Sequence, residues 1–364
     1  MLKYCNLCLS YMKQPICFLL LLFVFTKVDA QYQYDRYDSN YYVSYRDKLT
    51  LGPLLAKKNT AFKMNAPDAE HAFRYLSNSP GRFGIFADHD FLSLSASFGI
   101  GTIDPSYKKE KGSTKQTNLQ LSVTGRKVLV DLYVQKYKGL YANISEPAIY
   151  NSNNFYVRPD IETKLYGATV NLVKNQRRFS VQAPFMLNSR QKKSAGSLLY
   201  GGEFYWGSAK GDSAFIPSLL TDKYPHADVS KVDFITFGPG IGYGYTFVMK
   251  GHFFATAMAT VNADVSYIKE WAENDKLNTS WKFNPNLKVR SALGYNKEKW
   301  GVALSYTSNR LFFKATEADG RYLNYNDNYK LQYVRRIDAG KTVPKVTGFV
   351  KKVINKIGLG FLVN

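Results

Sequence analysis

The clearest feature of the sequence is a long alternation of apolar and polar positions. Between Phe253 and Tyr267, one set of alternate positions holds only Ala, Val, Phe and Tyr, whereas the other set is mostly Thr, Asn, Asp and Ser. Because successive side chains of a β-strand point to opposite faces, this pattern predicts a strand with one apolar and one mostly polar face. It is longer than the roughly 3–10 residues of an ordinary strand. Such strands are typical of outer-membrane β-barrels, whose outer face meets lipid.

The same alternation recurs along most of the chain and predicts an all-β, antiparallel transmembrane β-barrel of about twelve strands. The predicted strands are Leu49–Met64, Asp90–Ile100, Thr117–Thr124, Lys127–Tyr137, Glu162–Lys174, Phe179–Phe185, Leu198–Gly207, Thr236–Val248, Phe253–Tyr267, Asn286–Tyr295, Trp300–Phe313 and Tyr322–Arg336.

The connections between these strands test the count. Short turns of an outer-membrane barrel all lie at one end and long loops at the other. With the strands numbered as above, the turns at 175–176 and 249–251 fall at opposite ends. Between residues 177 and 235 the prediction therefore has one strand too few or one too many. About 10–14 strands are compatible with the pattern.

Residues 1–30 have the features of a cleavable signal peptide. Lys3 and Lys13 supply positive charge, Ile16–Phe25 is an unbroken apolar run, and Val28–Ala30 ends in a small residue. The apolar run is too short to cross a bilayer as a helix. Elsewhere the chain has no helix-length apolar segment, so membrane insertion requires a barrel. We therefore expect export, with cleavage near Ala30.

The remaining chain divides into three parts. Residues 31–46 form a polar, tyrosine-rich arm, and residues 47–340 form the barrel domain. Residues 341–364 form a basic tail whose apolar positions Val346, Val350 and Ile354 are separated by four residues. This spacing predicts a short amphipathic helix. Gly358 and Gly360 argue against a long helix, so a closing strand is the alternative.

Composition narrows the possible partners and cofactors. The three cysteines, Cys5, Cys8 and Cys17, all precede the expected cleavage point, so the exported chain has neither disulfides nor thiolate metal sites. The net charge of +21 indicates anionic partners. Export disfavours nucleic acid and leaves acidic glycans and outer-membrane lipids, including lipopolysaccharide phosphates. Solvated loop lysines account for the charge equally well. Protein partners cannot be deduced, and no cofactor is expected.

Charged residues at inward positions of the predicted strands are the first candidate site. Such residues line a water path or pair into a plug, and the sequence favours neither a narrow pore nor a plugged barrel. The predicted lumen-lining residues are Asp131, Glu203, Asp264, Lys288 and Arg290. A basic run, Arg190, Lys192 and Lys193, is a candidate contact for lipopolysaccharide phosphates, with a solvated loop as the alternative.

A catalytic serine requires a neighbouring histidine. Among the four histidines, His89 has a carboxylate on each side, Asp88 and Asp90, with Ser93 and Ser95 in the following strand. Those serines share the inward parity, so no catalytic residue is assigned. His252 lies at a turn, and His71 and His226 lie in loops.

Two segments carry oxygen or nitrogen ligands that a metal ion could use. They are Asp88–Asp90 and Asn324–Asn328, and neither has the full ligand spacing of a metal site. No metal is therefore expected.

Three segments, Tyr41–Leu51, Arg158–Val173 and Arg190–Gly202, resemble an uncharacterised family of Bacteroidetes-type outer-membrane β-barrel proteins known only as a domain of unknown function. The resemblance covers roughly residues 40–340. It implies a barrel in the outer membrane of a Gram-negative bacterium. It implies no activity and no catalytic residues.

The leading hypothesis is thus a small pore or a non-catalytic structural membrane protein. One alternative is a membrane-embedded hydrolase that acts on lipid or lipopolysaccharide. The other is an exported soluble β-protein that binds acidic ligands, and extraction without detergent would favour it.

Overall fold

The computed structural model describes most of the chain beyond the predicted signal peptide. The signal peptide, its cleavage point at Ala30 and the start of the arm lie outside the described residues. So do His71 and His226, and the glycines near the end of the tail. The described ranges are 37–65, 72–101, 110–143, 155–224, 227–272, 277–316 and 320–356.

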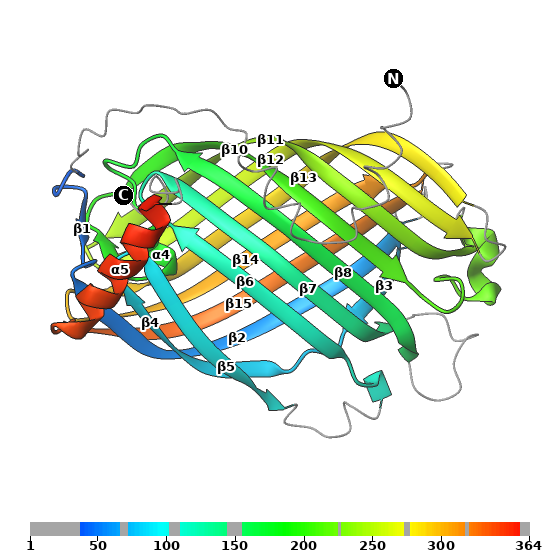
Figure 1. Cartoon of the computed structure of the whole chain (residues 1–364), viewed down its shortest axis with the longest axis horizontal. Helices are drawn as coiled ribbons and strands as arrows, with labels where there is room; N and C mark the ends of the chain where they lie inside the picture. The colour runs from blue at the N-terminus through cyan, green and yellow to red at the C-terminus, as the bar shows by residue number, and fades with distance from the viewer. Residues whose placement is uncertain are drawn as a thin grey trace. The chain divides into compact units, whose positions relative to one another are not determined.

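The fold is a closed antiparallel β-barrel (Figure 1). Closure comes from the pairing of the first long strand with the last, between Lys48–Asn65 and Arg321–Asp338. In the described part of the chain, ten strands form the closed ring. They are β2 (Lys48–Asn65), β3 (Ala72–Ser77), β7 (Val128–Asn143), β8 (Phe155–Val173), β10 (Ala195–Lys210), β11 (Val229–Met249), β12 (Phe253–Ala272), β13 (Leu277–Asn296), β14 (Trp300–Lys314) and β15 (Arg321–Asp338).

Three further strands belong to the same sheet: β4 (Gly81–His89), β5 (Leu92–Gly101) and β6 (Lys115–Thr124). β3 and β4 pair with successive stretches of β2, with Ala61 opposite Leu76 and Ala56 opposite Arg82. β5 pairs with β4, and β6 pairs with β7.

The structure differs from the predicted strands in two regions, one strand that does not exist and one stretch that was missed. Phe179–Phe185 is not a strand: its second half is the short helix α4 (Gln182–Phe185), in which the Met186 amide donates to the Gln182 carbonyl. The alternating Phe179 and Val181 are buried against the barrel wall, so their spacing imitates a strand. The region 72–89 was not predicted, because Pro80 interrupts the pattern between β3 and β4. Removing the false strand places all the short turns at one end.

The two faces of the wall have opposite chemistry. On β12, Val261 and Val265 are exposed on the outside, whereas Thr260, Asn262 and Asp264 are buried inside. The apolar parity of the predicted strand is therefore the outer surface of the barrel, and the polar parity fills its interior.

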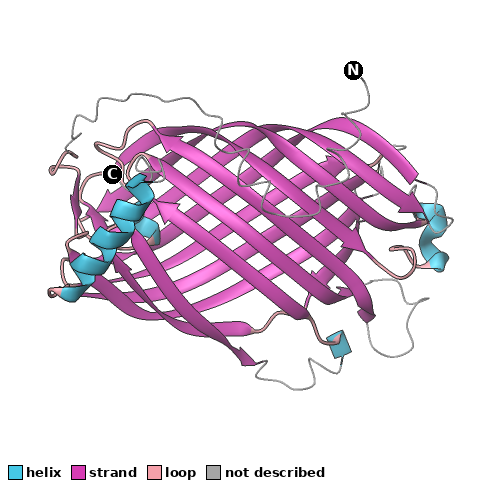
Figure 2. Cartoon of the chain, in the orientation of Figure 1, coloured by secondary structure: helices cyan, strands magenta, loops and turns pink. Residues whose placement is uncertain are grey.

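Each end of the barrel carries additional chain (Figure 2). The short-turn end carries α4, a two-stranded ribbon of β1 (Tyr42–Ser44) and β9 (Ser189–Gln191), and the helix α5 (Thr342–Lys356). α5 lies against β4, where the Thr347 hydroxyl is 3.1 Å from His89 Nδ1. The long-loop end carries a 3-10 helix, η2 (Ser218–Lys223). Among the described residues, no helix has the length and apolar character needed to cross a bilayer.

Candidate functional site

The interior of the barrel holds a buried ion cluster built around one carboxylate. Asp131 on β7 is 2% exposed and forms ion pairs with Lys288 and Arg290, both on β13. Ser122 and Thr169 donate further hydrogen bonds to its two oxygens, at 2.6 and 3.1 Å. The cluster therefore spans the barrel from β6, β7 and β8 to β13 on the far side.

A second cluster of polar side chains lies inside the barrel, with members on β12 and β13. The Asn286 side-chain amide donates to both Glu203 Oε1 at 3.0 Å and Asp264 Oδ2 at 2.7 Å. Thr236 donates to the same Asp264 oxygen at 3.0 Å. Asp264 and Asn286 are both almost completely buried. One amide thus holds two carboxylates from different strands together.

Glycines on β11 create the space for these groups. A Cβ added at Gly238 would lie 2.5 Å from Asp264 Oδ1, and one at Gly242 would lie 2.6 Å from the Thr260 methyl group. Between Gly238 and Gly244 the inward parity of β11 is consequently bare backbone, against which the polar side chains of β12 pack.

The five residues predicted to line the lumen are therefore all placed inside the barrel. Asp131, Lys288 and Arg290 form one cluster, while Glu203 and Asp264 meet at Asn286. Each of these five charged side chains contacts another side chain of the barrel.

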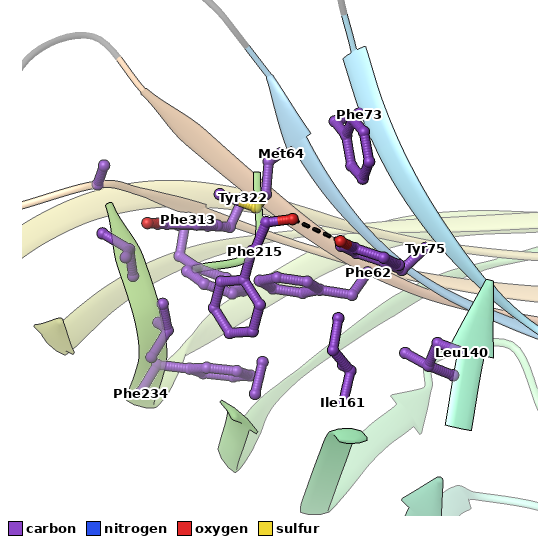
Figure 3. Close-up of a cluster of buried hydrophobic side chains, with 14 of the residues drawn as sticks. Phe62, Met64, Phe73, Tyr75, Leu140, Ile161, Phe215, Phe234, Phe313 and Tyr322 are labelled. Atoms are coloured by element: carbon purple, nitrogen blue, oxygen red, sulfur yellow. Dashed lines mark hydrogen bonds between the residues drawn. The ribbon is translucent and has the colours of Figure 1, made fainter. Parts of the chain in front are cut away.

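The long-loop end is filled by residues Gly211–Tyr224, which we call the long-loop plug. Phe215 is completely buried among Phe62, Phe234 and other large side chains, as Figure 3 shows. The Tyr75 hydroxyl donates to the Phe215 carbonyl at 2.5 Å. Arg158 at the start of β8 donates to the Ala214 carbonyl at 2.8 Å. An aromatic core thus closes this end of the barrel.

The short-turn end is filled by residues Lys174–Ser194, which we call the short-turn plug. Leu187 is completely buried, and its carbonyl accepts hydrogen bonds from Arg336 on β15. Gln332, also on β15, donates to the Phe185 carbonyl at 3.2 Å. On the opposite side, Gln182 donates to the Thr124 carbonyl at the end of β6. The plug therefore crosses the mouth of the barrel from one wall to the other.

The predicted anion-contact residues belong to this plug and its surroundings. Arg190 Nη1 is 3.1 Å from His252 Nδ1, and Lys192 Nζ donates to the Ser39 carbonyl at 2.9 Å. Lys193 Nζ lies 5.9 Å from the centre of the Tyr41 ring. Each of the three side chains thus contacts a different protein group.

The residues around His89 are directed to three separate partners. His89 contacts Thr347, Ser93 donates to Asp88, and Asp90 forms a 2.5 Å ion pair with Arg46. Within the described ranges, no three His, Cys, Asp or Glu side chains gather as metal ligands. The Asn324–Asn328 segment contains a 3.2 Å hydrogen bond between two of its own asparagines.

The two plugs and their anchors were missed from the sequence. Arg336 lies on the inward parity of β15 at the end of its predicted strand, so the alternation itself places this arginine inside. Nothing in the local sequence marks Phe215 as an interior residue, because its segment has no regular period.

These features define a class of protein: a closed antiparallel β-barrel with an apolar exterior, a paired polar interior and a plug at each end. The chain belongs to the family described as "Domain of unknown function (DUF4421)", which it matches over residues 36–334. No curated protein matches the sequence.

Solved structures of bacterial barrels are similar in fold. The outer membrane protease OmpT of Escherichia coli is 11% identical, with a TM-score of 0.37, and the match covers 80% of this chain and 97% of that one. OmpT of Vibrio cholerae is 10% identical, with a TM-score of 0.27 and coverages of 78% and 98%. The Pseudomonas putida toluene transporter TodX is 9% identical, with a TM-score of 0.26 and coverages of 80% and 90%.

Proposed function

We propose that the protein is a non-conducting structural barrel of the outer membrane of a Gram-negative bacterium. Its membrane location is supported by the outer surface of the barrel. Large apolar side chains are exposed on strand after strand, including Ile241, Phe283 and Leu293. A continuous apolar surface of this kind is not stable in water.

The dimensions of one strand agree with a bilayer. The apolar stripe of β12 begins at Phe253, which packs on Tyr295 at 4.7 Å between ring centres. It ends at Tyr267, which packs on Trp281 at 4.9 Å. At about 3.3 Å per residue and a tilt of roughly 45°, the stripe projects to roughly 33 Å, close to the hydrocarbon core of about 30 Å. Aromatic pairs at both ends fit the two membrane–water interfaces.

The observation that carries the non-conducting role is the presence of buried side chains at three successive levels of the barrel. The long-loop plug closes one end, the short-turn plug closes the other, and the Asp131 and Asp264 groups occupy the space between. An ion crossing the barrel would have to displace all three layers.

The proposal also sets an orientation. Short turns of outer-membrane barrels face the periplasm. The short-turn plug, with Arg190, Lys192 and Lys193, would then lie on the periplasmic side, away from the lipopolysaccharide leaflet. Membrane lipids remain the expected partners in this proposal, and the three basic residues serve to hold the plug.

Of the two alternatives, the exported soluble protein agrees least with the apolar exterior. The hydrolase requires a serine beside a histidine, whereas His89 contacts Thr347 and His252 contacts Arg190. Neither alternative explains why the chain devotes a buried segment to each end of the barrel.

Single-channel recording in planar bilayers tests the proposal. The protein, purified in detergent and shown to be folded by its heat-modifiable migration, is expected to insert without discrete conductance steps. A combined variant, Phe215→Ala with Leu187→Gly and Arg336→Ala, weakens both plugs and is expected to produce steps. Steps from the unaltered protein would refute the non-conducting role, and failure to insert would refute the membrane location.

A further inference from the structure

The wall of the barrel is interrupted on one side. Within the residues that the structure describes, β5 pairs only with β4, and β6 pairs only with β7. The ring closes beyond them through the short ladder between β3 and β7, from Tyr75–Ser77 to Leu140–Ala142. In Figure 1, β5 runs beside β4 while β6 follows β7. We call the region between the facing edges of β5 and β6 the seam.

Three side chains that point inward at the seam are exposed, whereas the inward side chains of β12 are all buried. Ser95 on β5 lies opposite the inward Phe86, and Gln120 and Ser122 on β6 lie opposite the inward Tyr133 and Asp131. All three seam residues are exposed. Inward residues of β12, by contrast, are buried throughout. Polar side chains of the inner face are therefore more accessible at the seam than on β12.

The outer margins of the seam are strongly apolar. Leu94 and Phe98 on β5, and Leu119 and Leu121 on β6, are among the most exposed large apolar side chains of the wall, at 55–64%. They lack a neighbouring strand that would cover one flank. A hydrocarbon chain lying along the seam would contact both margins.

Cationic side chains inside the barrel donate hydrogen bonds to both β5 and β6. Arg82 donates to the Ser97 hydroxyl at 3.0 Å and to the Ser97 carbonyl at 2.6 Å. Lys58 donates to Asn118 Oδ1 at 3.0 Å. Behind Ser122 lies the Asp131 cluster, in which two cations share one carboxylate.

The only other carboxylate bonded to a described side chain of these two strands is Asp88, through Ser93. Two cations, Lys58 and Arg82, thus contact the seam strands directly, while Lys288 and Arg290 are connected to Ser122 through the carboxylate of Asp131.

We propose that the seam binds an anionic membrane lipid, with its acyl chains against the apolar margins and its phosphate directed to Lys58 and Arg82. The geometry combines an apolar exterior margin with a cationic interior, which matches the two ends of such a molecule. Arg and Lys both bind phosphate, Arg through paired N–H donors and Lys as a compact charge. The lipid would also occupy the gap between two strand edges that face the bilayer. This inference rests on the membrane location proposed above.

Native mass spectrometry of the detergent-purified protein tests the proposal. Phosphatidylglycerol is expected to be retained over phosphatidylcholine with the same acyl chains. The double variant Lys58→Gln with Arg82→Gln is expected to lose about tenfold in this preference, as removal of charge-assisted hydrogen bonds requires. Lys282→Gln, a partly buried lysine on β13, is the matched control and should retain it. Equal retention of the two lipids, or an unchanged preference in the double variant, would overturn the proposal.

A labelling experiment keeps all the cations in place. The exported chain has no cysteine, so Gln120→Cys introduces a single thiol at the seam. Phosphatidylglycerol should slow its reaction with a water-soluble maleimide, and phosphatidylcholine should not. Glu298→Cys, in a short turn, should react equally in both lipids. Equal rates at position 120 would contradict lipid binding there. Resistance to alkaline extraction from vesicles tests membrane insertion separately, so failure of the seam and failure of the membrane location are distinguishable.

Discussion

Removal of one interior charge should destabilise the whole barrel. Asp131→Asn preserves the size of the side chain but removes the counter-charge of Lys288 and Arg290. Lys288 is 4% exposed, so it cannot recover its solvation without a rearrangement of the wall. The variant also changes the acceptor geometry for Ser122 and Thr169.

The magnitude follows from the contacts. Two charge-assisted hydrogen bonds contribute about 1.5–3 kcal/mol each, so the loss is about 3–6 kcal/mol. Breaking a buried ion pair by removing one partner costs about 3–5 kcal/mol by a separate line of measurement. We therefore expect the free energy of unfolding to fall by about 4 kcal/mol.

Urea unfolding in lipid vesicles, followed by tryptophan fluorescence, measures this change. Glu298→Gln, an exposed carboxyl in a short turn, is the control and should leave the free energy of unfolding unchanged. Adding Lys288→Met to Asp131→Asn removes one orphaned cation and should recover part of the loss. A loss below about 1 kcal/mol, or no recovery in the double variant, would show that charge pairing does not hold the interior together.

Two further predictions concern the close packing of the wall and the anchoring of a plug. Gly201→Ala places a Cβ 2.8 Å from a backbone carbonyl carbon of β8 and should reduce the yield of heat-modifiable barrel, whereas Gly81→Ala meets open space and should not. Arg336→Ala removes the donors to the Leu187 carbonyl, costs roughly 2–4 kcal/mol, and should speed amide hydrogen exchange in the short-turn plug. Arg335→Ala, on the outward parity, should leave that exchange unchanged.

The wall and the polarity of its two faces were predictable from the sequence. An outer surface of one chemistry and an interior of another impose a period of two on every strand, and β12 shows it almost without exception. The inward positions of Asp131, Lys288 and Arg290 follow from the same parity. Their pairing does not, because Asp131 and Lys288 are separated by 157 positions, and only the order of strands around the ring brings them together.

The plugs and the seam could not be predicted in this way. Phe179 and Val181 alternate like strand residues but are held by contacts with distant walls. Residues 211–224 carry no period, because each side chain meets a different part of the barrel. The break between β5 and β6 is an absence of pairing, and both strands show the alternation of strands that are fully paired.

The closure of the ring has a consequence for folding. β2 pairs with β15 through contacts such as Lys48 with Asp338, which are 290 positions apart in the chain. Contacts so distant in sequence form slowly. One edge of β2 therefore stays unpaired until β15 is in place. During that interval the edge can pair with other chains. Protection of this edge until β15 pairs with it therefore favours productive folding over aggregation.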